Sequence, residues 1–461
     1  MAESEAGDPT ELRRVEGKGD SPEKTMDSAS IFTRSEVREE ELDSTGKLPN
    51  EVVVMVLSCL TFKEAIRTSV LSTRWRDLWK TSDLVLNFDA SDELFVIYKT
   101  SSQGMMPLMA EKRWWYKNWV NGVVRQLQEH NALKLKQFRV VFNLTNQCNS
   151  EGDIDKWVRF AVSKRVDSLD LNFDVSGVGN AKLYVFSEDC YNHFKTPAGM
   201  SDIKSLRSLR LSCVEVRGEI IEHFISNCPL LEDLAVQQSN ALKQLRVVGS
   251  SLSPLRLKYL ELRYCWYLES LEIDHAPDLV RLIYDDCHRV EDLQVGNCPN
   301  LVDVTLGFGH CQYDVVFKAL SGCAIQLESL LLKTFAMGNL LHGVAEHTRL
   351  EQLTVEVMGG RNGSLVELVP LINACPRLHT LQVFLHTDSS DENRPQVVDV
   401  VKMHRESIKV VEIVGFRGFE MDCELVDTLS KLCSKEEADE AKMLALGYKS
   451  RAPPNIDFIV I

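Results

Sequence analysis

Apolar residues recur along most of the chain in the pattern L-x-x-L-x-L, in which aliphatic or aromatic side chains alternate with polar ones. This alternation is typical of a strand that buries one face and exposes the other. Looser copies begin at Leu135, Val166 and Ile408. Clear copies begin 22 to 28 residues apart, at Leu206, Leu231, Leu257, Leu279, Leu301, Leu327, Leu350 and Leu378. The pattern therefore predicts one short strand in each copy.

The intervals between the copies lie within the period of about 20 to 29 residues that leucine-rich repeats have. Between the strands, apolar residues at helical spacing predict amphipathic helices. These helices are expected at residues 114–127, 154–162, 220–226, 315–320 and 366–374. We therefore predict an α/β fold, a leucine-rich-repeat solenoid over residues 110–400 whose strands form a parallel sheet on the concave side.

The middle of the array has a shorter period. Copies at Leu257, Leu268, Leu279, Val290 and Leu301 are 11 residues apart. A four-residue strand alone uses about 13 Å of chain, so 11 residues cannot close a complete coil. We therefore expect each copy to be half of a 22-residue coil. The strands after residues 257, 279 and 301 should be concave, and the convex side should be extended rather than helical.

A helical pattern precedes the repeats, in residues 48–79. Its first helix is predicted from apolar residues that share one face, namely Val52, Val53, Val56, Leu57 and Leu60. Two more short helices are expected at residues 63–70 and 72–79. Three helices in about 35 residues make a small core, so this module should lean on a partner or on the next domain.

This segment resembles the F-box of the plant-type F-box/FBD/leucine-rich-repeat family. The resemblance rests on L-P-x-E at 48–51, R-T-S-V-L-S at 67–72, R-W at 74–75, L-W at 78–79 and the strand L-V-L-N-F-D at 84–89, with departures at residues 61, 62 and 73. It implies that residues 45–90 bind a Skp-type adaptor, and through it a cullin. The positions expected to bind the adaptor are Leu48, Pro49, Val53, Leu57, Val70 and Trp75.

The end of the chain, residues 401–461, resembles the FBD segment that closes many members of the same family. The similar residues are I-K-V-V-E-I at 408–413 and G-F-R-G at 415–418. A solenoid needs a terminal unit with a polar outer face, so we expect this segment to cap the array. The last residues, 451–461, depart from the usual ending of the family.

The composition and charge of the chain limit which partners and which cellular compartment we expect. The 461 residues include 52 basic and 67 acidic side chains, for a net charge of −15, which argues against nucleic acid as a partner. No apolar run approaches the length of about 18 residues that a membrane span needs, and the first ten residues do not resemble a secretory signal. We expect a nuclear or cytoplasmic protein whose residues 1–44 form a disordered acidic arm. Its 13 cysteines should be buried thiols.

No pattern of catalytic or cofactor-binding residues is present. The sequence contains no glycine-rich phosphate loop, no H-E-x-x-H motif and no C-x-x-C pair. The neighbouring pairs Cys287-His288 and His310-Cys311 cannot each chelate one metal ion at that spacing without other ligands. We therefore expect a protein that is not an enzyme and that binds no metal or cofactor.

A non-catalytic receptor would instead recognise a target protein, and the concave sheet is the expected surface for it. The half-coil assignment places charged, aromatic and aliphatic side chains on that face, among them Tyr259, Glu261, Arg263, Arg281, Ile283 and Asp285, with Asp303 and Thr305 on the next strand. Two functions fit the sequence. One is the substrate-recognition subunit of an SCF-type E3 ubiquitin ligase; the other is an acidic repeat protein, outside any ligase, that sequesters a protein partner.

Overall fold

The computed structural model describes residues 48–50, 52–53, 56, 67–68, 74–75, 84–91, 105–128, 134–143, 151–173, 183–250, 252–285, 292–308, 320–322, 325–334, 347–357, 368–386 and 410–414. The chain divides into two compact units, Met1–Gly46 and Lys47–Ile461. All the described residues belong to the second unit, and the following description concerns that unit alone.

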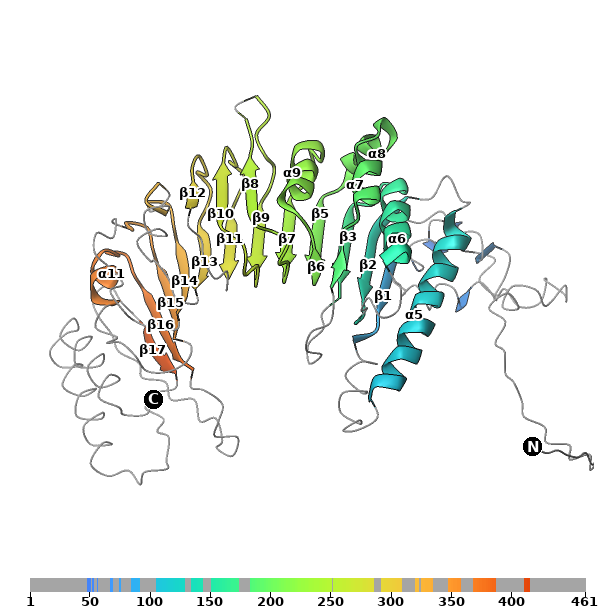
Figure 1. Cartoon of the computed structure of the whole chain (residues 1–461). Coiled ribbons are helices and arrows are strands. Elements are labelled where there is room, and N and C mark those ends of the chain that lie inside the picture. Colours follow the sequence, from blue (N-terminus) through green and yellow to red (C-terminus); the bar gives the residue numbers. More distant parts are fainter. Residues whose placement is uncertain are drawn as a thin grey trace, which may run out of the picture. The chain divides into compact units, whose positions relative to one another are not determined.

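A twelve-stranded parallel sheet runs through the second unit, with its strands in chain order (Figure 1). Its strands are β1 (Leu84–Asp89), β2 (Leu135–Val141), β3 (Ser168–Asn172), β5 (Ser208–Ser212), β7 (Asp233–Gln237), β9 (Tyr259–Arg263), β11 (Arg281–Asp285), β13 (Asp303–Phe308), β14 (Ser329–Thr334), β15 (Gln352–Val357), β16 (Thr380–Leu385) and β17 (Val410–Val414). Every clear and looser L-x-x-L-x-L copy supplies one of these strands. The predicted solenoid with a parallel sheet is therefore confirmed.

Helices cover the convex face of this sheet (Figure 1). They are α5 (Met105–Gln128), α6 (Glu151–Ser163), α7 (Glu188–Phe194), α8 (Pro197–Asp202), the 3₁₀ turn η2 (Ile203–Ser205), α9 (Gly218–Asn227) and α11 (Val369–Asn373). Helices were expected where α5, α6, α9 and α11 occur, whereas the expected helix at 315–320 lies outside the described residues except for Leu320. None of the described helices combines the length and apolarity that crossing a bilayer requires.

Over the middle coils, strands take the place of the helices. β8 (Gln244–Val248), β10 (Ser270–Asp274) and β12 (Asp292–Val295) pair in parallel as a separate three-stranded sheet. The strands that follow residues 257, 279 and 301 belong to the large sheet, as the half-coil argument predicted. The extended convex side begins one coil earlier than expected, because β8 precedes residue 257. Two short strands, β4 (Tyr184–Val185) and β6 (Val214–Glu215), form a further pair.

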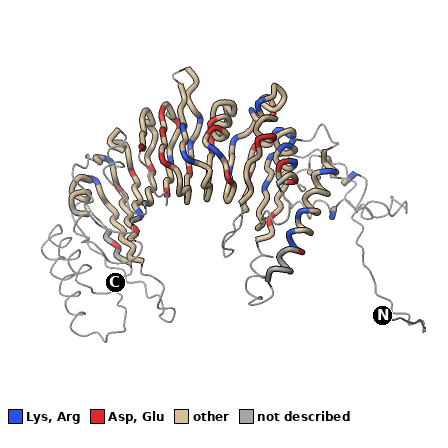
Figure 2. The backbone as a smooth tube through the Cα atoms, in the orientation of Figure 1, with Lys and Arg blue, Asp and Glu red and all other residues tan. Residues whose placement is uncertain are grey.

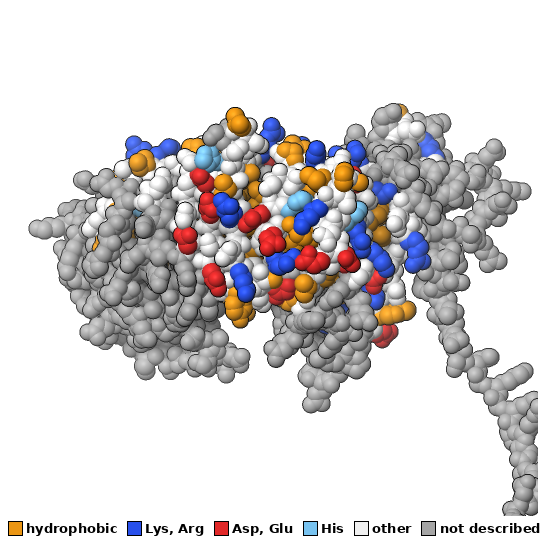
Figure 3. Space-filling model, turned by 45° about the horizontal axis from the view of Figure 1, so that its top comes forward, with side chains coloured by type: hydrophobic (Ala, Val, Ile, Leu, Met, Phe, Trp, Pro, Cys, Tyr) orange, Lys and Arg blue, Asp and Glu red, His pale blue; other side chains and the backbone are white. Residues whose placement is uncertain are grey.

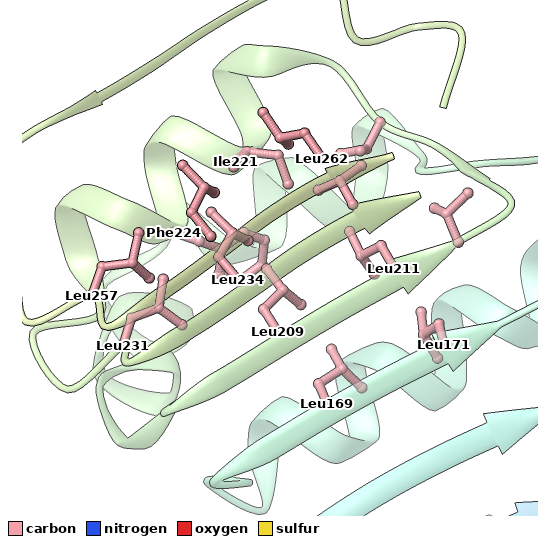
Figure 4. Packing of buried hydrophobic residues seen from close by; sticks show 14 of the residues in the cluster. Leu169, Leu171, Leu209, Leu211, Ile221, Phe224, Leu231, Leu234, Leu257 and Leu262 are labelled. Carbon is pink, nitrogen blue, oxygen red and sulfur yellow. The ribbon is translucent and has the colours of Figure 1, made fainter. Parts of the chain in front are cut away.

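The core lies between the large sheet and this second layer. Neighbouring strands place their leucines in register, so that Leu234 lies beside Leu260, and Leu260 beside Leu282. Ile221 and Phe224 of α9 pack from the other side (Figure 4), and all five side chains are fully buried. The repeats therefore share one continuous core, and each coil buries the apolar edge of the next.

Part of the F-box segment joins the same core. Val53 and Trp75 are buried in the cluster that contains the repeat leucines. The side chain of Arg74 donates hydrogen bonds to Asn50 Oδ1, at 2.9 Å, and to the carbonyl of Leu48. Arg74 therefore holds the start of the segment, which precedes it by 24 and 26 residues. The segment also supplies β1, the first strand of the large sheet. The helical module and the repeats therefore form one packed unit.

Candidate protein-interaction surface

The concave face of the large sheet carries its side chains in rows that cross the strands. Residues that share a register position lie side by side, as Glu261 of β9 does with Ala235 of β7 and Ile283 of β11. Figure 2 shows basic and acidic positions on neighbouring strands of the sheet. Because directly opposite side chains on paired strands are about 5 Å apart, charges in one row can pair across strands.

Glu261 lies at the centre of a polar cluster on β9. Its carboxylate accepts hydrogen bonds from Gln237 Nε2 at 2.8 Å, from the Tyr259 hydroxyl and from Arg263 Nε. Burial opposes ionisation, but these hydrogen bonds and the charge of Arg263 outweigh it, so the pKa of Glu261 lies below its ordinary value. Burial and the hydrogen bond to Glu261 raise the pKa of Tyr259 to about 12. The cluster is an ionised carboxylate held by neutral and cationic donors.

Asp285 of β11 links this cluster to the later strands. Its carboxylate lies 2.6 Å from Arg263 Nη1 and 3.1 Å from Lys333 Nζ, and Lys333 lies 3.4 Å from Glu356. β13 lies between β11 and β14, and its residue beside Lys333 is Gly307, which has no side chain to block the ammonium group. Burial favours the neutral amine, yet the two carboxylates raise the pKa of Lys333. One lysine therefore bridges three strands.

Similar pairs occur on the earlier strands. Arg139 of β2 lies 3.0 Å from both Asp89 of β1 and Asp170 of β3. Arg210 of β5 hydrogen-bonds to Asp233 of β7, at 3.1 Å from its Nε, and its guanidinium lies 5.5 Å from the centre of the Tyr259 ring. Arg139, Arg210 and Lys333 were not among the predicted site residues. The alternation within each strand places them on this face, so the same parity rule could have identified them.

The structure corrects the expected exposure of several predicted target-binding residues. Glu261, Ile283 and Asp285 do lie on the concave face, but they are only 5%, 2% and 3% exposed, and Thr305 is also buried. Glu261 is in contact with Gln237, Tyr259 and Arg263, and Asp285 with Arg263 and Lys333. Ile283 lies between Glu261 and Thr305 of the neighbouring strands. Tyr259, Arg263 and Asp303 are partly exposed, and Arg281, paired with Asp303 at 3.1 Å, is exposed. The accessible surface therefore includes Tyr259, Arg263, Arg281 and Asp303, while the carboxylates of Glu261 and Asp285 lie beneath it and bind Arg263.

The F-box segment presents a second, apolar surface. Leu48, Val52 and Val56 are 38%, 37% and 41% exposed, and Pro49 is exposed as well. Val53, predicted to bind the adaptor, is instead fully buried. Val52 and Val56, predicted on the same helical face as Val53, are exposed instead. Because they are four residues apart, they lie on one side of the helix.

Trp75, a second predicted adaptor contact, is also buried in the core, so it is not available to a partner in this structure. The predicted contacts Leu57 and Val70 lie outside the described residues. Of the six predicted adaptor positions, Leu48 and Pro49 are therefore the two that the structure describes as exposed.

The described cysteines are packing residues. Cys190, Cys213, Cys228, Cys265, Cys298 and Cys375 are buried free thiols. Burial raises the pKa of Cys228 and of Cys375 to about 12, and these thiols are protonated at neutral pH. Within the described part of the chain, no group of three or more His, Cys, Asp or Glu residues has the arrangement of a metal site.

Comparison with known proteins identifies both regions. The family model for the At1g61320/AtMIF1 leucine-rich-repeat domain matches residues 126–432, and the model for the F-box domain matches residues 46–87. The chain is 26% identical to the putative F-box/LRR-repeat protein At3g42770 of Arabidopsis thaliana, over 82% of this chain and 70% of that protein. It is 25% identical to the F-box/FBD/LRR-repeat protein At5g22700 of the same plant, over 80% and 85% of the two chains. The chain therefore belongs to the F-box/leucine-rich-repeat family, with a repeat domain of the At1g61320/AtMIF1 type.

Proposed function

We propose that this protein is the substrate-recognition subunit of an SCF-type E3 ubiquitin ligase and acts in the nucleus or cytoplasm. The F-box segment would bind a Skp-type adaptor, and through it a cullin, while the concave sheet binds a target protein. The observation that carries the proposal is the apolar surface of Leu48, Val52 and Val56, in a segment that matches the F-box model. A helix with an exposed apolar face suits recognition in the groove of a partner.

This function needs no catalytic group on the chain. A receptor of this kind acts by holding its target near a separately recruited conjugating enzyme, which raises the effective concentration of the reacting groups. The concave face offers what target binding requires, because Tyr and Arg are the residue types that anchor protein interfaces. Tyr259, Arg263 and Arg281 are at least partly accessible there. Acidic and basic groups alternate on this face, so we expect a target surface of mixed charge.

Adaptor binding is tested by co-purification of the full chain with a Skp-type adaptor. The double substitution Val52→Asp with Val56→Asp places two charges on the exposed apolar surface and should abolish co-purification. The control is Leu252→Asp, which changes an almost fully exposed leucine on a loop of the repeats and should leave adaptor binding intact. Circular dichroism of each variant shows whether it is folded.

If a folded chain with the double substitution still binds the adaptor, this apolar surface is not part of the interface. If the wild-type chain binds its protein partner but no adaptor, the alternative function is favoured, an acidic repeat protein that sequesters its partner outside any ligase.

Target binding is tested separately. The double substitution Tyr259→Ala with Arg281→Glu should weaken target capture from cells with a blocked proteasome. The control Arg246→Glu makes the same charge reversal at an exposed position of β8, on the convex layer. Deletion of residues 1–44 should leave target capture unchanged. If the deletion abolishes target capture and the double substitution has no effect, the target is recognised by residues 1–44 and not by the sheet.

A further inference from the structure

A groove on the helical side of the unit gathers more basic than acidic side chains. It lies between α5, α6 and α7, has a volume of about 660 Å³ and is open to solvent. Its lining includes Arg125, Lys156, Arg159, Ser163 and His193, together with the single carboxylate Asp153. Figure 3 shows Lys and Arg side chains gathered toward the right of the view, over the helices of the first coils. The local excess of cations is thus opposite in sign to the net charge of the whole chain, −15.

Well-packed helices build this groove. Lys156, Arg159 and Ser163 recur on α6 at the i, i+3, i+7 spacing that places side chains on one face. The two long helices are joined beneath the groove: Trp157 Nε1 donates a hydrogen bond to Asn121 Oδ1 at 2.7 Å, and Lys164 Nζ to the carbonyl of Gln128 at 3.1 Å. The basic side chains are therefore carried by two helices that are joined to each other, and not by a loop.

The basic groups lack matching carboxylates. Asp153 is shared by Lys117 at 3.4 Å and Lys156 at 3.6 Å. Arg159 donates from Nε to the carbonyl of Asp155 at 3.3 Å, and among the described residues neither Arg159 nor Arg125 has a carboxylate partner. On the concave face, by contrast, the arginines of β2, β5, β9 and β11 are each paired with a carboxylate. The groove thus holds three permanent cations against one carboxylate, 3 − 1 = +2.

We propose that this groove binds a small phosphate-bearing molecule that carries at least two negative charges. Two guanidinium groups offer the paired N–H donors that suit phosphate oxygens, and Lys156 and His193 add further hydrogen-bonding groups. A single carboxylate would leave part of the positive charge uncompensated, whereas a phosphate dianion matches it. Small-molecule sites range from about 300 to 1,000 Å³, so the groove has a suitable size. This inference does not depend on the proposed ligase function, since the groove and the concave sheet are on opposite sides.

The test is calorimetric titration of the full chain with pyrophosphate and with inorganic triphosphate at low ionic strength. Saturable binding is expected. The double substitution Arg125→Gln with Arg159→Gln should weaken it by at least about tenfold, the effect of losing about 1.4 kcal/mol. The control, Arg207→Gln with Arg246→Gln, removes the same charge from two exposed arginines elsewhere and should change the affinity less than about twofold.

Three results would overturn the proposal: no saturable binding of either anion, an equal loss of affinity in the control, or binding of a phosphoserine peptide without binding of pyrophosphate. The last result would identify a peptide-docking surface. If the double variant does not fold, Lys156→Gln, at a highly exposed position of the same groove, replaces it and should weaken binding in the same direction.

Discussion

Adjacent residues of β11 face opposite sides of the sheet, yet both are buried. Leu282 enters the continuous core, while Ile283 lies on the concave face beside Glu261 and Thr305. The alternation of the sequence identified these two directions correctly. It did not predict that Ile283 would be covered, because the covering side chains belong to neighbouring coils, 22 residues away in either direction.

Alanine substitutions at these two positions should therefore lower the free energy of unfolding by different amounts. Leu282→Ala leaves a cavity in a closed core and should cost about 2 to 5 kcal/mol of unfolding free energy. Ile283→Ala should cost about 1 to 2 kcal/mol, since polar neighbours and water can enter the space on the concave face. Urea unfolding of both variants measures the difference. A larger loss for Ile283 than for Leu282 would reverse the assigned faces.

Glu261 should make stability depend on pH. Its pKa is lowered by folding from the ordinary value of 4.5, so its ionised form stabilises the native state. This contribution is present above pH 4.5 and is lost as the pH falls through the folded pKa. In Glu261→Gln the contribution is absent at every pH, so the variant should be less stable than wild type at pH 7, by about 1 to 3 kcal/mol. The two proteins should converge in acid.

Thermal unfolding between pH 7 and pH 3 measures this convergence. The matched variant is Glu272→Gln on β10, whose carboxylate pairs with Arg246 at an exposed site. It should lower stability much less at neutral pH, because exposed ion pairs contribute little. A difference between Glu261→Gln and wild type that stayed constant down to pH 3 would contradict the assigned role of the Glu261 carboxylate.

The contact between α9 and β8 depends on a glycine. A Cβ atom built on Gly218, at the start of α9, would lie 1.9 Å from the carbonyl oxygen of Gln244, the first residue of β8. Backbone approaches backbone there, because the convex layer changes from a helix to a strand within one coil. No flexible side chain is available to move away, so either the helix or the strand has to shift.

Gly218→Ala should therefore destabilise the protein by more than about 2 kcal/mol. Gly122→Ala is the matched control. Gly122 lies within α5, and a Cβ atom built there meets nothing within 4 Å. Alanine at that position should stabilise by about 0.5 to 1 kcal/mol through its helix propensity. Chemical denaturation of the two variants should thus shift in opposite directions.

A helix or strand could be predicted from the sequence where its apolar residues recur at a regular spacing. The strands and the half-coils follow from spacing alone, because 11 residues cannot close a coil. α7 and α8 were missed because both are short. Each of these helices begins at a capping residue instead: the Ser187 hydroxyl accepts a hydrogen bond from the Cys190 N–H, and the Thr196 hydroxyl accepts one from the Gly199 N–H. A single capping residue gives no periodic pattern in the sequence. Val53 was assigned to the adaptor from the F-box resemblance, and helical spacing could not correct this, because it shows which residues share a face and not what covers that face.

The sheet extends across the boundary between the F-box segment and the repeats. β1 belongs to the F-box segment in sequence, but Phe88 packs against Trp119 of α5, with ring centres 5.0 Å apart, and against Phe138 of β2, at 5.7 Å. Tyr116 of α5 donates its hydroxyl to the Phe88 carbonyl. The first strand of the array is therefore provided by the module that precedes it.

Truncation should show this dependence. A fragment of residues 80–461 retains β1 but loses the buried side chains of Val53 and Trp75, so it should unfold at a lower urea concentration than the full chain and serves as the reference for the next fragment. A fragment of residues 92–461 lacks Leu86 and Phe88 and exposes the edge of β2, so it should lose at least about 3 to 5 kcal/mol, the cost of one buried phenylalanine. Equal unfolding midpoints would mean that the repeats fold without the strand from the F-box segment.

The charge pairs of the concave face also fix the order of the coils. In the apolar core, one coil resembles the next, and a duplicated or deleted coil would still bring leucine against leucine. On the concave face, Arg139 requires an acidic residue on both sides. Lys333 requires a carboxylate on one neighbouring strand and, on its other side, a glycine with a carboxylate on the strand beyond it. Unequal recombination that changed the number of coils would bury charges without partners. The apolar core would allow the number of coils to change during evolution, whereas the charge pairs of the concave face restrict the array to this order of coils.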